Sequence, residues 1–464
     1  MNPLVTRALA GALAITLAGT LTACEPDPVR STLQRLADPV VVTGGQMAGL
    51  AGTAPDRVVA FRASSKGWTQ IPVQVDERLD TTMAGVYGLP RSQTFYGSSI
   101  DVPVNVYADP GTFVGADPDA ALDADDEVVF MARDAGGPAG DLPAPAGTAG
   151  GGVEVRIDDP DDPDATGYVY LFGSDGSLDP GAGKQYVDYD FNLLSGDYKT
   201  TYKRTDGPNP EDSTVTGATY TAHTSDRWLM DSLTITQGSK PGVDLVDRMK
   251  YDIQLLCLRN ENTFNDEEGA FIVNRSGPVR ALRSYAGANS GPNTQNTHAF
   301  YDMAIDSTVN LRVHSIPNVA AHLDLGPEAI GMTLRDPAVP GGVTIDGVPE
   351  TLPPTTPTWW TVSGPQGGLA FSATYDTDAA DPASRWYEDD TTPANRQCTG
   401  DGQAIGDTGS FSPEIACTDP GLGCSQHFTA GYRIVLGPAG LSAEGLQAMA
   451  EQGLRPLTVT VAPR

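Results

Sequence analysis

Val102-Pro-Val-Asn-Val-Tyr107 alternates side chains in the pattern of a β-strand, and Thr458-Val-Thr-Val461 repeats this alternation near the C-terminus. A period of two places every second side chain on the same face of a strand. Similar short runs, rich in β-branched and aromatic residues and bounded by turn residues, recur along the chain. They cover residues 39–43, 57–62, 71–75, 102–107, 127–132, 153–157, 168–172, 186–191, 198–203, 252–258, 279–285, 310–316 and 457–461. This spacing predicts a mainly β protein, built as one or more large antiparallel β-sandwiches with long loops.

One short helix is expected near the C-terminus. Ser442 has the character of a helix N-cap, and residues 443–452 place Leu446, Met449 and Ala450 on one face. A glycine and then a proline follow and are typical of a helix end.

Composition narrows the class of protein. Gly and Pro make up 52 and 37 of the 464 residues, which favours many turns and few long helices. The formal net charge is −30, and nucleic-acid binding needs clustered Lys and Arg. We therefore expect neither a nucleic-acid partner nor electrostatic docking on anionic lipid.

The N-terminus predicts a bacterial lipoprotein. Arg7 precedes the weakly polar to apolar run 8–21, which is too short to span a membrane and ends in Leu21-Thr22-Ala23-Cys24. This resembles the lipobox at which a signal peptidase cleaves before a lipid-modified cysteine. Cys24 would carry the acyl chains and anchor the protein outside the cytoplasm, in the bacterial cell envelope. The alternative is an ordinary secretory signal that happens to contain a cysteine.

Four cysteines remain after Cys24, an even number in an exported chain. We predict disulfides and favour Cys257 with Cys398 and Cys417 with Cys424. A zinc site is the alternative, but no two of these cysteines have Cys-x-x-Cys spacing.

The predicted organisation has four segments: a signal peptide (1–23), a lipid anchor and tether (24–37), an N-terminal β domain with an acidic loop (38–177) and a C-terminal β-sandwich domain (178–464). Familiar catalytic motifs do not occur. The chain lacks a Gly-x-Ser-x-Gly elbow, a complete phosphate-binding loop and a His-Glu-x-x-His zinc motif.

The first candidate site is acidic. Asp119, Asp123, Asp125 and Glu127 lie close together in sequence, and alternating carboxylates can converge on one hard cation such as Ca²⁺. A candidate calcium site is therefore one interpretation, and a solvated acidic hairpin is the other. Asp76, at the end of the strand-like run 71–75, is a further carboxylate that could join this group.

The second candidate site is a polar stretch between residues 274 and 302. It contains a set of ligand-type side chains: Arg280, Tyr285, Asn289, Asn293, His298 and Tyr301. Arginine, amides and aromatic rings suit sugar hydroxyls and carboxylates, and Tyr or His beside Arg could support β-elimination on a uronate. The alternative is a long hairpin loop whose polar side chains bind their own backbone. In a regular strand Arg280 would point away from Arg283 and Tyr285.

Three segments resemble the large β-sandwich of galactose-mutarotase-type carbohydrate enzymes and polysaccharide lyases: Gly277-Pro-Val-Arg280, the turn from Trp360 to Gly368, and the terminal helix followed by a strand. The lipobox together with Trp68, Asp76-Glu77 and Gly287-Ala-Asn-Ser-Gly-Pro292 is also similar to uncharacterised bacterial surface lipoproteins. The first resemblance implies a carbohydrate ligand, and the second gives no indication of an activity.

Two function classes follow. The first is a lipid-anchored extracytoplasmic protein that binds, and as an enzyme would process in the manner of a lyase, a carbohydrate-like ligand. The second is a non-enzymatic structural or surface lipoprotein, stabilised by calcium if the acidic loop binds it. Convergence of the second candidate site in one cleft would favour the first class, and dispersal would favour the second.

Overall fold

The computed structural model describes residues 30–95, 98–202, 211–226, 229–237, 242–253, 269–287, 292–310, 319–356, 358–377, 383–392, 403–414, 428–437 and 441–464. Within them the protein is mainly β with antiparallel sheets, which confirms the predicted fold class. The described α-helices are α1 (Met83–Val86) and α3 (Ala443–Leu454). The N–H of Gly445 donates to Ser442 Oγ at 3.1 Å, so Ser442 caps α3 as predicted. None of the helices in the described segments is long and apolar enough to cross a bilayer.

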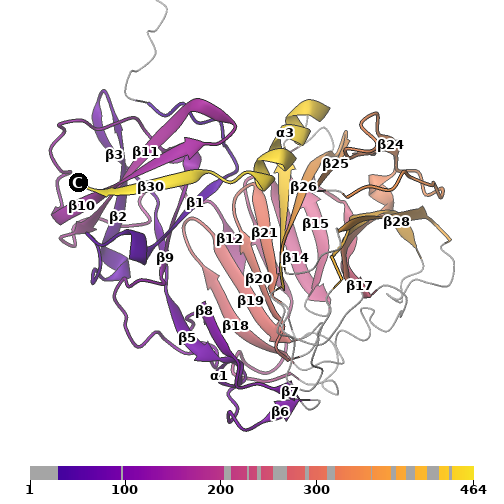
Figure 1. Ribbon diagram of the computed structural model, residues 1–464, viewed down its shortest axis with the longest axis horizontal. Coiled ribbons are helices and arrows are strands. Elements are labelled where there is room, and N and C mark those ends of the chain that lie inside the picture. The colour runs from indigo at the N-terminus through magenta and orange to yellow at the C-terminus, as the bar shows by residue number, and fades with distance from the viewer. Residues whose placement is uncertain are drawn as a thin grey trace, which may run out of the picture.

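The N-terminal part contains four small sheets and the last strand of the chain (Figure 1). Its five-stranded sheet consists, in spatial order, of β3 (Gly67–Ile71), β2 (Val58–Ser64), β11 (Asp162–Ser174), β10 (Thr148–Asp159) and β30 (Thr458–Pro463). A three-stranded sheet packs on it, with the order β1 (Pro39–Thr43), β9 (Glu127–Met131) and β4 (Gln74–Asp76). Two hairpin-like pairs complete this part: β5 (Arg78–Thr82) with β8 (Pro103–Tyr107), and β6 (Thr94–Phe95) with β7 (Ser98–Ser99). Short 3₁₀ helices lie at Gly44–Gln46, Pro55–Arg57, Ala132–Asp134 and, later in the chain, Pro327–Ala329.

A nine-stranded sheet runs through the middle of the molecule (Figure 1). Its order is β18 (Gly269–Ser276), β19 (Ala281–Gly287), β20 (Gln295–Phe300), β21 (Ala304–Asn310), β29 (Phe428–Gly437), β26 (Gly367–Thr377), β25 (Trp359–Gly364), β23 (Thr333–Arg335) and β24 (Val343–Thr344). The first four strands follow one another in sequence as hairpins. The strand β29 then returns from far along the chain to join β21 to β26.

Two further sheets cover one face of this central sheet. One has the order β12 (Asp188–Asp190), β13 (Ser213–Thr216), β14 (Tyr220–Asp226), β15 (Leu229–Ile235) and β16 (Val243–Asp244). The other has the order β17 (Val246–Ile253), β22 (Val319–Leu325), β28 (Ala404–Phe411) and β27 (Ser384–Asp390). Their apolar side chains, such as Leu233 and Leu323, pack with Phe300, Trp360 and Leu436 of the central sheet. We call this side the inter-layer face.

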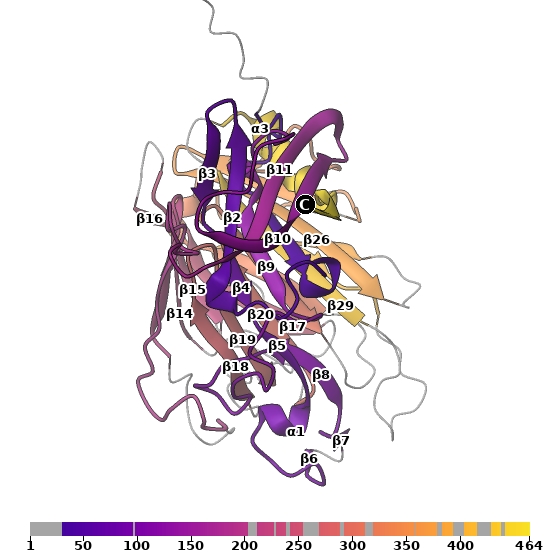
Figure 2. The same ribbon diagram turned by 90° about the vertical axis from the view of Figure 1, so that its left-hand side faces the viewer.

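The opposite face of the central sheet meets the N-terminal part, and we call it the seam. Leu282 and Tyr301 pack there against Met83 and Val129 of the N-terminal part. The helix α3 packs on the same face over β25, β26 and β29 through Leu446. Figure 2, turned by 90°, has the N-terminal part toward the viewer, with β2, β3, β10 and β11 above the β5–β8 pair and α1.

Three details differ from a simple strand-by-strand prediction. The run 71–75 divides at Pro72, since Ile71 ends β3 and Gln74 begins β4. The described part of the run 198–203 forms only an isolated bridge, and Tyr198 and Tyr202 pack edge-on against Phe271 instead of pairing as a strand. The runs 252–258 and 310–316 lie mostly outside the described residues.

Two contacts in the structure cross the predicted segment boundaries. The strand β30, at the end of the segment predicted as the C-terminal domain, pairs with β10 of the N-terminal part. Of the predicted tether, the described portion lies against the body, where the N–H of Thr32 donates to the carbonyl oxygen of Thr166 at 3.0 Å.

Candidate functional site

Arg280 connects three separate stretches of the sequence at the seam. It precedes β19, and its backbone N–H donates to Gln74 Oε1 at 3.0 Å. Its guanidinium donates from Nε to Asp76 Oδ2 at 2.9 Å and from Nη2 to Glu127 Oε2 at 2.6 Å. Asp76 and Glu127 lie directly opposite each other in the β4–β9 register, so neighbouring strands present both carboxylates to one arginine.

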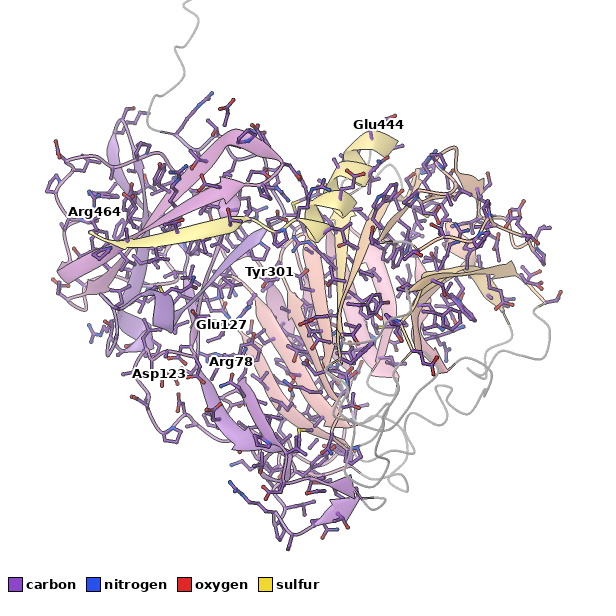
Figure 3. The ribbon with its side chains drawn as sticks, viewed as in Figure 1. Arg78, Asp123, Glu127, Tyr301, Glu444 and Arg464 are labelled. Atoms are coloured by element: carbon purple, nitrogen blue, oxygen red, sulfur yellow. The ribbon has the colours of Figure 1, made fainter. Side chains whose placement is uncertain are left out.

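Two further side chains complete what we call the Arg280 centre, namely Arg78 and Tyr301, which Figure 3 shows near Glu127. Arg78 Nη1 donates to Glu127 Oε1 at 2.8 Å, so both oxygens of this carboxylate bind arginine. Burial opposes ionisation of Glu127, but Arg280 and Arg78 outweigh it and lower its pKa. Tyr301 Oη accepts from Arg280 Nη1 at 3.3 Å, and burial raises the pKa of Tyr301 to about 12. Tyr107 Oη also donates to Glu127 Oε2, at 2.9 Å. The centre is thus a network of carboxylates, arginines and phenols, in which Glu127 is ionised and Tyr301 is neutral at physiological pH.

Two other predicted ligand residues lie on the inter-layer face. The aromatic rings of Tyr285 and His298 lie 6.0 Å apart between centroids, beside Arg283. Arg283 donates from Nε and Nη2 to the two carboxylate oxygens of Glu211 at 2.9 and 2.6 Å. His298 Nδ1 and Ser307 Oγ are 2.8 Å apart. Burial, and then the charge of Arg283, lowers the pKa of His298 to about 3, so this imidazole is neutral at physiological pH.

The second candidate site is therefore dispersed. Arg280 and Tyr301 meet at the seam, whereas Tyr285 and His298 lie on the other side of the same sheet, as strand alternation predicts for Arg280 and Tyr285. Asn293 is buried, and its Nδ2 donates to the carbonyl oxygen of Ser99 at 2.9 Å. Asn289 lies outside the described residues.

The four predicted calcium ligands bind different partners. Glu127 belongs to the Arg280 centre, and Asp125 Oδ2 accepts from Asn105 Nδ2 at 2.5 Å. Asp123 Oδ1 accepts from the N–H of Asp125 at 3.2 Å, and Asp119 Oδ1 accepts from a backbone N–H in its own turn. A side-chain hydrogen bond with Asp125 is the largest cause that raises the pKa of Asp123 to about 6. These contacts suit a self-bonded acidic hairpin better than one shared cation.

A different acidic group has closely placed oxygens. Among the described residues, Asp346, Glu350 and Asp389 each offer a carboxylate oxygen within 4.8 Å of the others. Asp389 is buried and accepts from the backbone N–H groups of Gly347 and Gly406. No local pattern in the sequence marks this group, because Asp389 comes from a distant strand.

Sequence reasoning also missed buried pairs such as Arg283 with Glu211 and Lys250 with Asp324. A signal was available: an arginine or lysine inside a strand of apolar residues needs a buried partner. The identity of that partner could not be read from the chain. Cys24, Cys257, Cys398, Cys417 and Cys424 lie outside the described residues, so lipidation and the disulfides stay predictions.

No protein-family model matches this chain, and no curated protein matches it. The resemblances to carbohydrate-active β-sandwiches and to surface lipoproteins therefore stay predictions.

Proposed function

We propose that this protein is a lipid-anchored, non-enzymatic component of the bacterial cell envelope, in which a buried charge network holds two β parts as one rigid body. The observation that carries the proposal is the Arg280 centre. Arg280, the best candidate for binding a substrate carboxylate, already binds Asp76 and Glu127 from the neighbouring part of the molecule.

Lyase chemistry would need a proton-accepting side chain beside a free cationic group. Burial raises the pKa of both Tyr285 and Tyr301 to about 12, which keeps both phenols protonated. The imidazole of His298 has a pKa lowered to about 3 and lies on the inter-layer face, away from Arg280. Among the candidate residues that the structure describes, the groups that β-elimination requires are thus separated by the sheet or occupied by ion pairs.

Rigidity follows from where the charges lie. A buried ion pair that loses one partner leaves an uncompensated charge, at a cost of about 3–5 kcal/mol. Arg280 bonds across the seam to two strands of the N-terminal part, so opening the seam would expose several such groups at once.

The proposed lipid anchor rests on the lipobox that ends at Cys24. The described chain begins at Arg30, which already bridges to Gly136 of the body. Five residues separate Cys24 from Arg30, so six extended Cα–Cα steps would hold the body within about 20 Å of a lipid on Cys24.

Two measurements test the proposal. An absorbance screen for unsaturated products on a panel of polyuronates should show no turnover by the full chain, and turnover that is lost in Arg280→Gln would overturn the non-enzymatic assignment. Cys24→Ser should stop incorporation of radiolabelled fatty acid and remove the protein from the membrane fraction. Unchanged labelling of that variant would overturn the anchor.

A further inference from the structure

A group of buried titratable side chains lies in the four-stranded sheet, whose strands β17 and β28 are at the right of Figure 1. Ala321 and Leu323 of β22 pack toward the central sheet, so the alternate residues His322 and Asp324 point away from it. Lys250 of β17 lies directly opposite His322 in the strand register and therefore shares its face. Lys250, His322 and Asp324 are nevertheless only 1%, 4% and 1% exposed.

Lys250 and Asp324 form an ion pair that is costly to keep charged. Lys250 Nζ donates to Asp324 Oδ2 at 2.5 Å, and Lys250 is the only buried lysine among the described residues. Two charges removed from water carry a desolvation penalty that their attraction often does not repay. An amide bond between the two groups would remove both charges. A lysine amine can form this bond, whereas the guanidinium of Arg280 or Arg283 keeps its proton.

The atoms that would react are already close together. Because a carbon–oxygen bond is about 1.2 Å long, Cγ of Asp324 lies no more than about 3.7 Å from Lys250 Nζ. The other carboxylate oxygen, Oδ1, accepts from the backbone N–H of Ile405 at 3.0 Å. A fixed N–H donor at this oxygen stabilises the negative charge that develops there when an amine adds to the carbon.

A group that can carry a proton lies on the same face. His322 Nδ1 is 2.6 Å from Asp407 Oδ1, and the two side chains are 1% and 0% exposed. When Nδ1 carries the proton toward Asp407, Nε2 has the lone pair of a base. Among the described residues, this buried Nε2 has no hydrogen-bond partner. A carboxylate that orients one nitrogen of an imidazole and leaves the other to accept a proton is the arrangement of a general base.

We propose that Lys250 and Asp324 join spontaneously in an isopeptide bond between β17 and β22. Lys250 passes its ammonium proton to Asp324 Oδ2, and the neutral amine then attacks Cγ of the neutral carboxyl group. The Nζ–Cγ bond forms, Oδ1 carries the negative charge, and His322 Nε2 takes a second proton from the nitrogen. His322 returns this proton to Oδ2, the Cγ–Oδ2 bond breaks, and one water molecule leaves. The sum is the loss of water from the ion pair, with no oxidant or co-reactant.

The inference goes beyond the proposed function, because it depends neither on the lipid anchor nor on the absence of turnover. The bond would join two residues that are 74 positions apart in the chain. A cross-link of this kind restricts the unfolded chain, and so it stabilises the fold in the way a disulfide does but resists reduction.

Peptide mass spectrometry of the full chain tests the bond. The protein is denatured, reduced, alkylated and digested with trypsin, which does not cleave after an acylated lysine. Residues 249–259 should then be found joined to residues 313–335, with the mass of the two peptides less one water. The peptide 251–259, which requires cleavage after Lys250, should be nearly absent from the parent. Asp324→Ala should release this peptide in full, and the digest does not require that variant to fold.

Lys184 provides an internal control in the same digest. Its Nζ lies 3.5 Å from Asp302 Oδ2, but its side chain is 56% exposed, so water solvates this ion pair. Cleavage after Lys184 should therefore release residues 185–199 in full. His322→Gln tests the proton carrier and should lower the linked fraction of freshly made protein by about tenfold or more.

Each outcome decides a part of the inference. A linked pair in the parent that is absent from Asp324→Ala supports the bond. The inference is overturned if the parent releases residues 251–259 as fully as Asp324→Ala does. Parental linkage in His322→Gln would overturn the role of His322. If that variant loses the β-sheet circular dichroism of the parent, Asp407→Asn replaces it, because it removes the carboxylate that orients His322, and parental linkage there overturns the same role.

Discussion

Buried charged side chains are arranged differently on the two faces of the central sheet. At the seam, arginines bind several carboxylates in networks: Arg280 binds Asp76 and Glu127, and Arg433 binds Asp38 and Asp306. On the inter-layer face Arg283 forms a two-bond pair with Glu211, bordering the largest apolar core. When Arg280 is lost, Glu127 keeps Arg78 and a side chain that is 15% exposed, whereas the side chains of Arg283 and Glu211 are only 2% and 1% exposed. The seam should therefore tolerate single substitutions better than the inter-layer face.

The largest effect is expected for Arg283→Ala. This change leaves Glu211, which is 1% exposed, without its bidentate partner and should lower the free energy of unfolding by about 3–5 kcal/mol. Urea denaturation followed by fluorescence measures it. Replacing both residues, Arg283→Met with Glu211→Leu, should recover most of the loss, because an apolar pair leaves no buried charge. A single-variant loss below about 1 kcal/mol would contradict the contrast between the faces.

Arg280→Ala should cost less, about 2–3 kcal/mol, because both carboxylates keep a partner. Glu127 keeps Arg78 and some solvent access, and the buried Asp76 keeps its two hydrogen bonds from Gln74 Nε2. The same urea experiment applies. Arg78→Ala is the matched control at the same carboxylate, and its partly exposed side chain should make its loss about 1 kcal/mol or less. Equal losses for the two variants would show that Arg280 is not the main connection across the seam.

The third prediction concerns pH. Unfolded histidine has a pKa of about 6.5, whereas His298 in the fold is held to about 3, so the unfolded chain binds more protons between these values. Stability from this residue therefore falls as the pH drops below about 6.5, by at most about 1.4 kcal/mol per pH unit. The seam behaves differently: the lowered pKa of Glu127 contributes stability above the usual glutamate pKa, and that stability is lost only as the pH falls below it.

Unfolding curves at pH 7.5, 6 and 5 check this window. His298→Asn should flatten the pH dependence over it. His223 is the matched control, because Asp212 and Asp231 outweigh burial and raise its pKa. Its contribution is present at low pH and lost as the pH rises, so His223→Asn should steepen the fall in stability toward acid. The same slope in both variants would contradict the assignment to His298.

The smallest effect is expected at the acidic hairpin. The raised pKa of Asp123 means that its contribution is present below the usual aspartate pKa and lost as the pH rises through about 6. Asp123→Asn should then raise the melting temperature at pH 8, by roughly 1 °C or less, and leave it unchanged at pH 4. Differential scanning fluorimetry measures both.

Calcium separates the two interpretations of this hairpin. We expect any calcium-induced rise in melting temperature to be equal in Asp123→Asn and the parent, measured against sodium chloride at the same ionic strength. A rise that disappears in the variant would restore the segment as a calcium site.

Local patterns predicted much of the fold. Residues 39–43 and 127–132 were expected as strands and form β1 and β9, and the helix begins at its predicted cap. The opposite orientation of Arg280 and Tyr285 also followed from alternation. These features depend on backbone geometry and on neighbours a few residues away, so the sequence contains them directly.

The candidate site was predicted residue by residue but not as an arrangement. Arg280, Tyr301 and Glu127 were all marked as functional, yet two separate roles were assigned to what is one network. Any of 59 acidic residues could have been the partner of Arg280, and nothing local distinguishes Asp76 or Glu127 among them.

What the sequence by itself determined is therefore the type of element at each place and the side on which each residue of a strand lies. The tertiary structure alone decided which strands pair across hundreds of residues, as β10 does with β30, and which charges meet at the seam. The physical reason is that pairing and burial depend on the summed packing of distant side chains. A hollow of about 260 Å³ at the seam exists only because residues near position 40, near 306, near 433 and near 457 are brought to one place by that packing.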